Sequence, residues 1–311
     1  MTADVFMSGL AFELGERESL ACLLTDDNHE MIDALRDNGV RFFRQSAKTP
    51  MELGGLSLQR TMVSSGCDPS EIDLLLYCSE SRERPPARDF QVLCGESGLS
   101  KVPIVNVSMS GCANFLPALR FARGLILTEG LRRVAIVTAD KFVGESRITE
   151  LGIAVLSDGA ASCILSAESR PGAVRVLGLG HVANQDLRQL DYGVNRPRIL
   201  MAIAGGVRRA QRQALREAGI DAQDVESMIC TTLRHDSTRF FAHQCGFPIE
   251  NVFTQTLADI SHAFSADLVI NLLEGRSWMA DKGCLGRPFL ALALGPFTWG
   301  AFIGQHVDAE A

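Results

Sequence analysis

The chain has 311 residues, of which 46% are hydrophobic and 22% are charged. A chain of this length can bury a sizeable core without disulfides or metals. The net charge of −7 is spread along the sequence, so nothing favours binding to nucleic acid or to an anionic membrane. The start lacks the basic and apolar regions of a signal peptide, and no run approaches the ~20 apolar residues of a membrane span. We therefore expect a cytoplasmic protein.

Nine cysteines, an odd number, are spread along the chain. Most of them lie in apolar stretches, which is typical of reduced, buried thiols and not of a disulfide framework. The sequence contains no Cys-x-x-Cys pair and no His-x-x-x-His pair, so we expect no metal site. Any one cysteine is therefore expected to be a small buried hydrophobe unless its surroundings indicate otherwise.

Apolar runs of strand length alternate with stretches of helical period along the chain. In the first part we predict strands at residues 72–77, 102–107, 134–138 and 161–165, and helices at residues 53–65 and 115–128. After about residue 172 we predict strands at residues 174–177, 227–231, 252–255 and 289–294, and helices at residues 207–218 and 263–273. This alternation predicts an α/β protein with parallel sheets and helical covering layers.

A short segment of the first part returns in the second. Both copies run from the end of a helix, through a glycine and an acidic turn, into an apolar strand. The matched pairs, all 153 positions apart, are Gly66/Gly219, Asp68/Asp221, Glu71/Asp224 and Ile72/Val225. Such a link is common in α/β proteins, but a period of about half the chain is typical of a tandem duplication. We therefore predict two related halves, residues 1–170 and residues 171–311.

The duplication predicts where a site forms, because parallel sheets place functional groups at the carboxyl ends of their strands. The predicted strand 102–107 leads into Cys112, and the predicted strand 252–255 leads into His262. Under a pseudo-twofold axis these two turns are equivalent, so we expect Cys112 and His262 to meet. A cysteine beside a histidine indicates a nucleophile more strongly than either residue alone.

Cys112 follows Gly111 and opens the predicted helix 115–128. A thiol in the first turn of a helix faces free backbone N–H groups and the positive end of the helix dipole, which both favour the thiolate. Gly111 allows a sharp turn and a close approach of substrate. The same turn directs the Cys112 N–H towards an oxyanion on a bound acyl carbon. We therefore expect Cys112 to be a nucleophile and one donor of an oxyanion hole.

Several segments resemble the thiolase superfamily, and specifically its β-ketoacyl-acyl-carrier-protein synthase III branch. They are the nucleophile turn and the end of its helix (110–115 and 122–126), the next strand (132–140), a Ser-Asp-Gly-Ala turn (156–165) and a closing strand (297–301). The resemblance is good from about residue 68 to the end. It implies a thiolase-like five-layered α-β-α-β-α fold and a homodimer. It also implies chemistry on acyl thioesters of coenzyme A (CoA) or acyl carrier protein, with no permanently bound cofactor.

The resemblance assigns roles to two histidines. The family's second catalytic residue, a histidine after a strand, corresponds to His235, although a lone histidine there is more often a surface or capping residue. His262 stands where the family has asparagine. It is either a catalytic residue or only a packing replacement. A Cys-His-His set resembles the elongating ketosynthases, in which two neutral imidazoles donate to the enolate of a decarboxylating malonyl thioester. Alternatively, one imidazole acts as a general base on an alcohol or amine acceptor.

Further site residues are implied near the closing strand and early in the chain. Pro296 has no N–H, so we expect Gly295 to complete the oxyanion hole, and we expect Phe264 and Phe297 to bind substrate. The family's early tryptophan, which grips the adenine of CoA, is absent, because the only tryptophans here are Trp278 and Trp299. The candidates for an alternative clamp are Phe42 or Phe43 with Arg44. Arg82, Arg84 and Arg88 form either a docking rim for an acidic carrier protein or a solvated loop.

The leading hypothesis is an enzyme that takes an acyl group onto Cys112 from a CoA or carrier-protein thioester. The second step would be a decarboxylative Claisen condensation in polyketide, fatty-acid or secondary-metabolite biosynthesis. An acyltransferase that forms an ester or amide is a close alternative, and a simple thioester hydrolase is a third. From another class, the chain could be a non-catalytic partner subunit of a ketosynthase-like complex.

Overall fold

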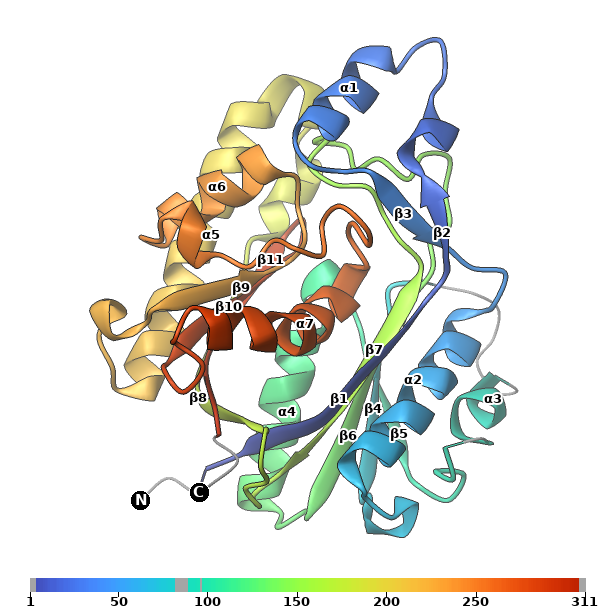
Figure 1. The fold of residues 1–311 in the computed structure, drawn as a ribbon, viewed down its shortest axis with the longest axis vertical. Coiled ribbons are helices and arrows are strands. Elements are labelled where there is room, and N and C mark those ends of the chain that lie inside the picture. Colours follow the sequence, from blue (N-terminus) through green and yellow to red (C-terminus); the bar gives the residue numbers. More distant parts are fainter. Residues whose placement is uncertain (1–3, 82–88, 96, 308–311) are drawn as a thin grey trace.

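A computed structural model describes residues 4–81, 89–95 and 97–307 (Figure 1). The strands are β1 (Phe6–Leu14), β2 (Glu16–Ser19), β3 (Phe42–Gln45), β4 (Leu74–Cys78), β5 (Ile104–Val107), β6 (Arg133–Asp140), β7 (Gly159–Ser166), β8 (Val174–Ala183), β9 (Ser227–Cys230), β10 (Phe289–Leu294) and β11 (Thr298–His306). The α-helices are α1 (His29–Asp37), α2 (Pro50–Ser65), α3 (Asp89–Gly95), α4 (Phe115–Thr128), α5 (Tyr192–Ala218), α6 (His235–Gln244) and α7 (Asp267–Asp281). Within the described part of the chain, no helix is both long and apolar enough to span a bilayer.

The large sheet has the strand order β5-β4-β6-β7-β1-β8-β11-β10-β9. It divides into two groups, because β1 and β8 pair at only two positions, Phe6 with Arg175 and Met7 with Val174. Strands β4, β5 and β6 are parallel to one another, as are β9 and β10, whereas the pairs in the middle are antiparallel. The prediction of parallel sheets therefore holds for the outer strands and was wrong for the middle of the sheet. The reason is that β7 follows β6 without a helical crossover, and that the unpredicted strand β1 and the closing strand β11 pair antiparallel with their neighbours.

Helices form three layers around the two strand groups, and each layer has its own apolar core. Helices α2 and α3 cover the outer face of the first group, and α5 and α6 cover the outer face of the second (Figure 1). Helices α4 and α7 lie between the groups, where Phe115, Leu119 and Leu268 pack against strands of both. The layers thus follow the order α-β-α-β-α. The predicted five-layered fold is confirmed.

The two copies of the repeated segment fold alike. Gly66 and Gly219 both end a helix with positive φ, at 60° and 69°. Asp68 and Asp221 each begin a short 3₁₀ turn, and each donates its own N–H to the acidic side chain three residues later. The same local chemistry therefore feeds β4 and β9.

Two predicted elements of the second half differ from the structure. Residues 252–255 do not form a strand: Val252 makes a single bridge to Met228, and the chain then turns so that the Leu257 N–H reaches the carbonyl of Thr254. The predicted helix 263–273 begins later, at Asp267, after a 3₁₀ turn over Phe264–Ala266. Both changes affect the loop that carries His262.

A small N-terminal unit lies over one end of the sheets. Strands β2 and β3, the 3₁₀ turn Leu20–Leu23 and α1 surround their own cluster, in which Phe43 contacts Val155 and Leu257 of the main body. The Phe42 N–H also donates to the carbonyl of Ala258. The unit is therefore anchored to the segment that precedes His262 and to Val155, whose carbonyl accepts the His262 N–H.

Candidate active site

The nucleophile lies where β5 runs into α4. The chain turns through Met109 and Gly111, which have φ angles of 76° and 59°, and Cys112 occupies the short 3₁₀ turn Gly111–Ala113. A Cβ atom on Gly111 would lie 3.0 Å from Cδ of Pro296. Glycine is thus required at this position both for its backbone conformation and for the close approach of the closing loop. The predicted elbow is present.

His262 faces the nucleophile from the second half. Its Nε2 lies 3.1 Å from Sγ of Cys112, and the imidazole is buried. The backbone of His262 is held on both sides, because its N–H donates to Val155 and its carbonyl accepts from the Ser157 N–H. The structure therefore brings together Cys112 and His262, the two residues that the sequence repeat paired.

Asp267, which was not predicted as a site residue, completes the group. Its Oδ2 lies 2.5 Å from Nδ1 of His262 and accepts the Thr232 N–H at 2.8 Å, while Oδ1 accepts the Ala263 N–H at 2.7 Å. The carboxylate is 1% exposed. Burial alone would lower the pKa of His262, but the charges of Cys112 and Asp267 and their hydrogen bonds outweigh it and raise that pKa well above its usual value. Cys112, His262 and Asp267 therefore have the geometry of a nucleophile–base–carboxylate triad.

A signal for Asp267 exists in the sequence. It is an acidic residue directly before the apolar run that continues α7, five positions after His262. A carboxylate that enters an apolar helix at its first turn needs donors, and it finds them in the free N–H groups at the start of α7 and in the imidazole.

His235, predicted as a catalytic residue, lies elsewhere. It is the first residue of α6, its N–H donates to the carbonyl of Asn38, and its ring packs against Gly39 so closely that a Cβ there would lie 2.4 Å from Nε2. His235 does not line the cavity that contains Cys112. The structure does not bring this histidine to the nucleophile, so a Cys-His-His arrangement has no geometric support.

The two expected oxyanion donors, the N–H groups of Cys112 and Gly295, differ in their availability. The Gly295 N–H donates to the Thr298 carbonyl at 2.9 Å, which closes the β10–β11 hairpin, so in this conformation it serves the hairpin. The next residue, Pro296, contacts the nucleophile turn and has no N–H to offer. The Cys112 N–H is therefore the candidate that the geometry leaves for the oxyanion.

A cavity of about 360 Å³ opens beside the triad. Phe264 and Phe297, the two predicted substrate contacts, both line it. The ring of Phe264 stacks against His262 at 6.0 Å, and Phe297 lies under the guanidinium of Arg188 at 5.0 Å. Most of the remaining wall is apolar and comes from Leu151, Ile153, Ala154, Leu156, Ile203, Leu233, Phe241 and Leu294. Its size and lining suit a small apolar acyl group.

Comparisons with known proteins agree with this architecture. No family model matches the chain. β-Ketoacyl-acyl-carrier-protein synthase III 3 from Streptomyces coelicolor is 22% identical over 306 residues, which cover 89% of this chain and 88% of that protein. The solved structure of ChlB3, described as an acyltransferase, matches with a TM-score of 0.81 at 19% identity over 98% of each chain. 3-Oxoacyl-acyl-carrier-protein synthase III from Aquifex aeolicus matches with a TM-score of 0.79 at 18% identity, over 97% of this chain and 99% of that one.

This chain has the thiolase fold of these structures, and its sequence is similar to those of β-ketoacyl-acyl-carrier-protein synthase III proteins. The resemblance predicted from the sequence segments is thus confirmed, as is the fold that it implied. The relatives are synthases or acyltransferases by name.

The N-terminal unit of this chain offers no simple clamp for adenine. Arg44 forms an ion pair with Asp259 and also donates to the Asp259 carbonyl. Phe43 is 1% exposed, and Phe42 is covered by the guanidinium of Arg17 at 4.1 Å. These side chains already have partners, so they do not form the alternative clamp. Arg82, Arg84 and Arg88, the suggested docking rim, lie outside the described residues.

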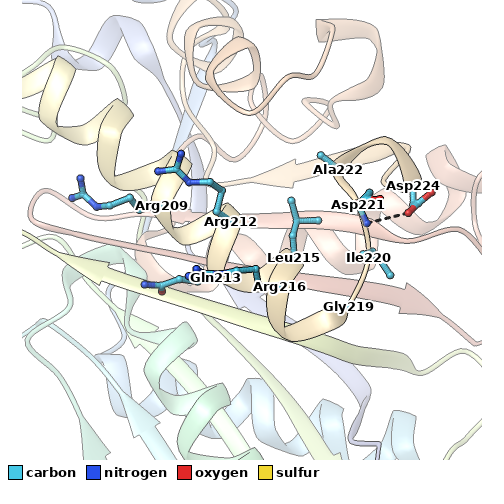
Figure 2. A pocket seen from close by; sticks show the side chains of 10 residues that line it. All are labelled: Arg209, Arg212, Gln213, Leu215, Arg216, Gly219, Ile220, Asp221, Ala222 and Asp224. Carbon is cyan, nitrogen blue, oxygen red and sulfur yellow. Dashed lines mark hydrogen bonds between the residues drawn. The ribbon is translucent and has the colours of Figure 1, made fainter.

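A larger hollow, of about 780 Å³, lies on the surface at the C-terminal part of α5 and the turn that follows it (Figure 2). Its wall contains Arg209, Arg212 and Arg216 on the helix and Asp221 and Asp224 on the turn. Figure 2 shows the two aspartates joined by the hydrogen bond that caps the 3₁₀ turn. The residues that line this hollow include no cysteine and no histidine, so the smaller cavity beside Cys112 is the candidate active site.

Proposed function

We propose that the protein transfers an acyl group from a CoA or carrier-protein thioester, through Cys112, to the hydroxyl or amine of a second substrate. The observation that carries this proposal is the line of contacts from Cys112 through His262 to Asp267. A carboxylate on Nδ1 orients the imidazole and stabilises its protonated form, which suits a base that removes a proton from an attacking group.

The reaction would proceed in two balanced steps. First, the Cys112 thiolate attacks the acyl carbon, the carbon–sulfur bond of the donor breaks, and protonated His262 gives its proton to the departing thiolate. Second, His262 takes the proton of the acceptor hydroxyl or amine as that group attacks the acyl-enzyme. The tetrahedral intermediate then expels the Cys112 thiolate, and protonated His262 again lies beside it.

Decarboxylative condensation is the second candidate, and the names of the synthase III relatives favour it. Two features of the site argue for acyl transfer instead. An enolate needs donors, but His262 is the one imidazole among the described residues that line the cavity. The charged side chain that lines the cavity beside the triad is Glu150, and its negative charge disfavours a malonyl carboxylate.

We propose a homodimer that forms across β5. This strand is one of the two edges of the large sheet, and open edges usually need a cover. Apolar side chains are exposed on and beside it, at Val105 and Met109, and on the neighbouring helix α4, at Phe121 and Leu127. A second copy would cover both.

A role in polyketide, fatty-acid or secondary-metabolite assembly is part of the same proposal and is supported by the names of the relatives.

The test is intact-protein mass spectrometry with acetyl-CoA, hexanoyl-CoA and benzoyl-CoA as probes. We expect a mass increase of one acyl group in the wild type and in Cys22→Ala, which removes an exposed cysteine, but not in Cys112→Ala. Acylation of Cys112→Ala would contradict the assignment, and absence of acylation in every variant would favour a non-catalytic subunit.

The acceptor is tested by chasing the acyl-enzyme. Discharge by a panel of sugars, aliphatic alcohols and primary amines, with ester or amide products, supports the proposal. Discharge by malonyl-CoA or a malonyl carrier protein, with release of carbon dioxide and a 3-oxoacyl product, would establish condensation instead. Discharge by water alone would indicate a hydrolase.

A further inference from the structure

The carboxylate of Glu80 binds the backbone of the turn that carries Cys112. Oε1 of Glu80 accepts hydrogen bonds from the Met109 N–H at 2.8 Å, the Gly111 N–H at 3.0 Å and Nδ2 of Asn114 at 2.7 Å. The Asn114 amide is fully buried, and its Oδ1 accepts the Ser110 N–H at 2.9 Å. Glu80 therefore binds both residues of the turn that have positive φ directly, and it holds Ser110, which lies between them, through Asn114.

Glu80 is itself fixed by the neighbouring strand. It lies just beyond the end of β4, and its N–H donates to Oδ1 of Asp140 at 2.8 Å. Asp140 ends β6, is 1% exposed, and also accepts from the N–H of Ser81 and the hydroxyl of Ser79. The two carboxylates thus connect the carboxyl ends of β6 and β4 to the turn that follows β5.

We propose that Glu80 is a positioning residue that sets both the shape of the nucleophile turn and the readiness of Cys112 to ionise. This inference rests on the proposed function only in taking Cys112 as the nucleophile. By binding the N–H groups of Met109 and Gly111, Glu80 occupies donors that would otherwise favour an anion at the turn. By adding a negative charge nearby, it also opposes the thiolate.

Several charged groups face Cys112, and the test must separate them. His262 lies directly against the sulfur, with Asp267 behind it. Glu150 lines the same cavity, and Glu80 lies under the turn, with Asp140 behind it. Glu80→Gln removes one charge but keeps an oxygen that can accept the same hydrogen bonds, whereas Glu80→Ala removes both. Glu129→Gln is a matched charge control, because Glu129 is exposed and lies at the far end of α4.

The experiment uses peptide mapping to measure the rate at which iodoacetamide alkylates Cys112. The rate is measured at a series of pH values from about 5 to about 10. We expect the midpoint of the Glu80→Gln profile to move to lower pH by about one unit, because a nearby negative charge is removed. In the acyl-transfer assay we expect Glu80→Gln to retain its maximal kcat. We expect Glu80→Ala to lose about tenfold to a hundredfold in kcat with little change in KM, because the turn is no longer held in place. Glu129→Gln should match the wild type in both assays.

A Glu80→Gln profile that coincides with that of the wild type would overturn the charge effect, and full kcat in Glu80→Ala would overturn the positioning role. If Glu80→Ala does not fold, Glu80→Gln still decides the charge effect, and Asn114→Ala, which removes the amide between Glu80 and Ser110, decides the positioning role by the same loss of kcat. Alkylation needs no acyl donor. If the proposed acyl transfer fails, the alkylation rates of wild type and Glu80→Gln can therefore still be compared.

Discussion

The turn that carries Cys112 and the loop that carries His262 come from corresponding parts of the two halves, yet they are supported differently. The first follows a paired strand, β5, and its backbone N–H groups are bound by the side chain of Glu80. The second follows a single bridge at Val252, and its loop is tied down by Ser157 and Arg44. Both segments are therefore held by side chains from other parts of the chain, but the nucleophile turn also follows a strand that is paired in the sheet.

Each of the two segments also has its own carboxylate, and the two carboxylates act on different atoms. Glu80 accepts from backbone N–H groups and an amide, so it holds the turn in shape and acts on Cys112 without contacting its thiol. Asp267 contacts the reactive imidazole itself, so it changes proton affinity as well as shape. The loss of charge at Asp267 should therefore cost far more activity than the loss of charge at Glu80.

Asp267→Asn gives the largest expected effect. We expect kcat for acyl transfer to fall by about 10²–10⁴-fold, because an amide cannot stabilise the imidazolium and can favour the wrong tautomer of His262. The Asp267 carboxylate raises the pKa of His262. In Asp267→Asn the imidazolium should therefore lose its proton at a lower pH. Steady-state kinetics across pH measures both effects. Activity within threefold of the wild type at all pH values would show that Asp267 is only structural.

The sequence alone could predict one side of this comparison better than the other. The bounds of α4 and the elbow at Gly111 follow from local pattern, and the prediction for residues 115–128 matches α4. The repeat also led correctly to the contact between Cys112 and His262. Asp267 was missed because the predicted helix 263–273 placed it inside a regular helix, whereas Phe264, with a φ of 52°, turns the chain so that α7 begins at Asp267.

The structure also explains why His235 was misleading. A histidine after β9 matches the family's pattern, but the direction of its side chain depends on packing between α6 and the α1–β3 connection, through Gly39. That contact joins residues almost 200 positions apart and leaves no local signal. Long-range packing of this kind is the part of the site that propensity and spacing do not encode.

Ser157→Ala tests whether the base loop depends on remote side chains, and its expected effect is intermediate. The Ser157 hydroxyl accepts the Arg44 N–H at 2.9 Å and donates to the Ile260 carbonyl, all in a buried setting. Loss of these bonds should lower the free energy of unfolding by about 1–3 kcal/mol and reduce kcat severalfold, because His262 is less firmly placed. Urea unfolding measures the first effect, with the exposed Ser169→Ala as control. If both variants unfold alike, the loop is held by its backbone alone.

His235→Ala has the smallest expected effect and sharpens the comparison most directly. The imidazole packs against Gly39 and does not line the cavity, so its removal should leave a small void beside α6 and should not disturb Cys112. We expect kcat to stay within about threefold of the wild type and the rate of Cys112 acylation to be unchanged. His243→Ala, on the same helix, is the matched control. A hundredfold loss of kcat in His235→Ala but not in His243→Ala would mean that α6 moves during the reaction and brings His235 into the site. His262 would then share the proton transfers with His235.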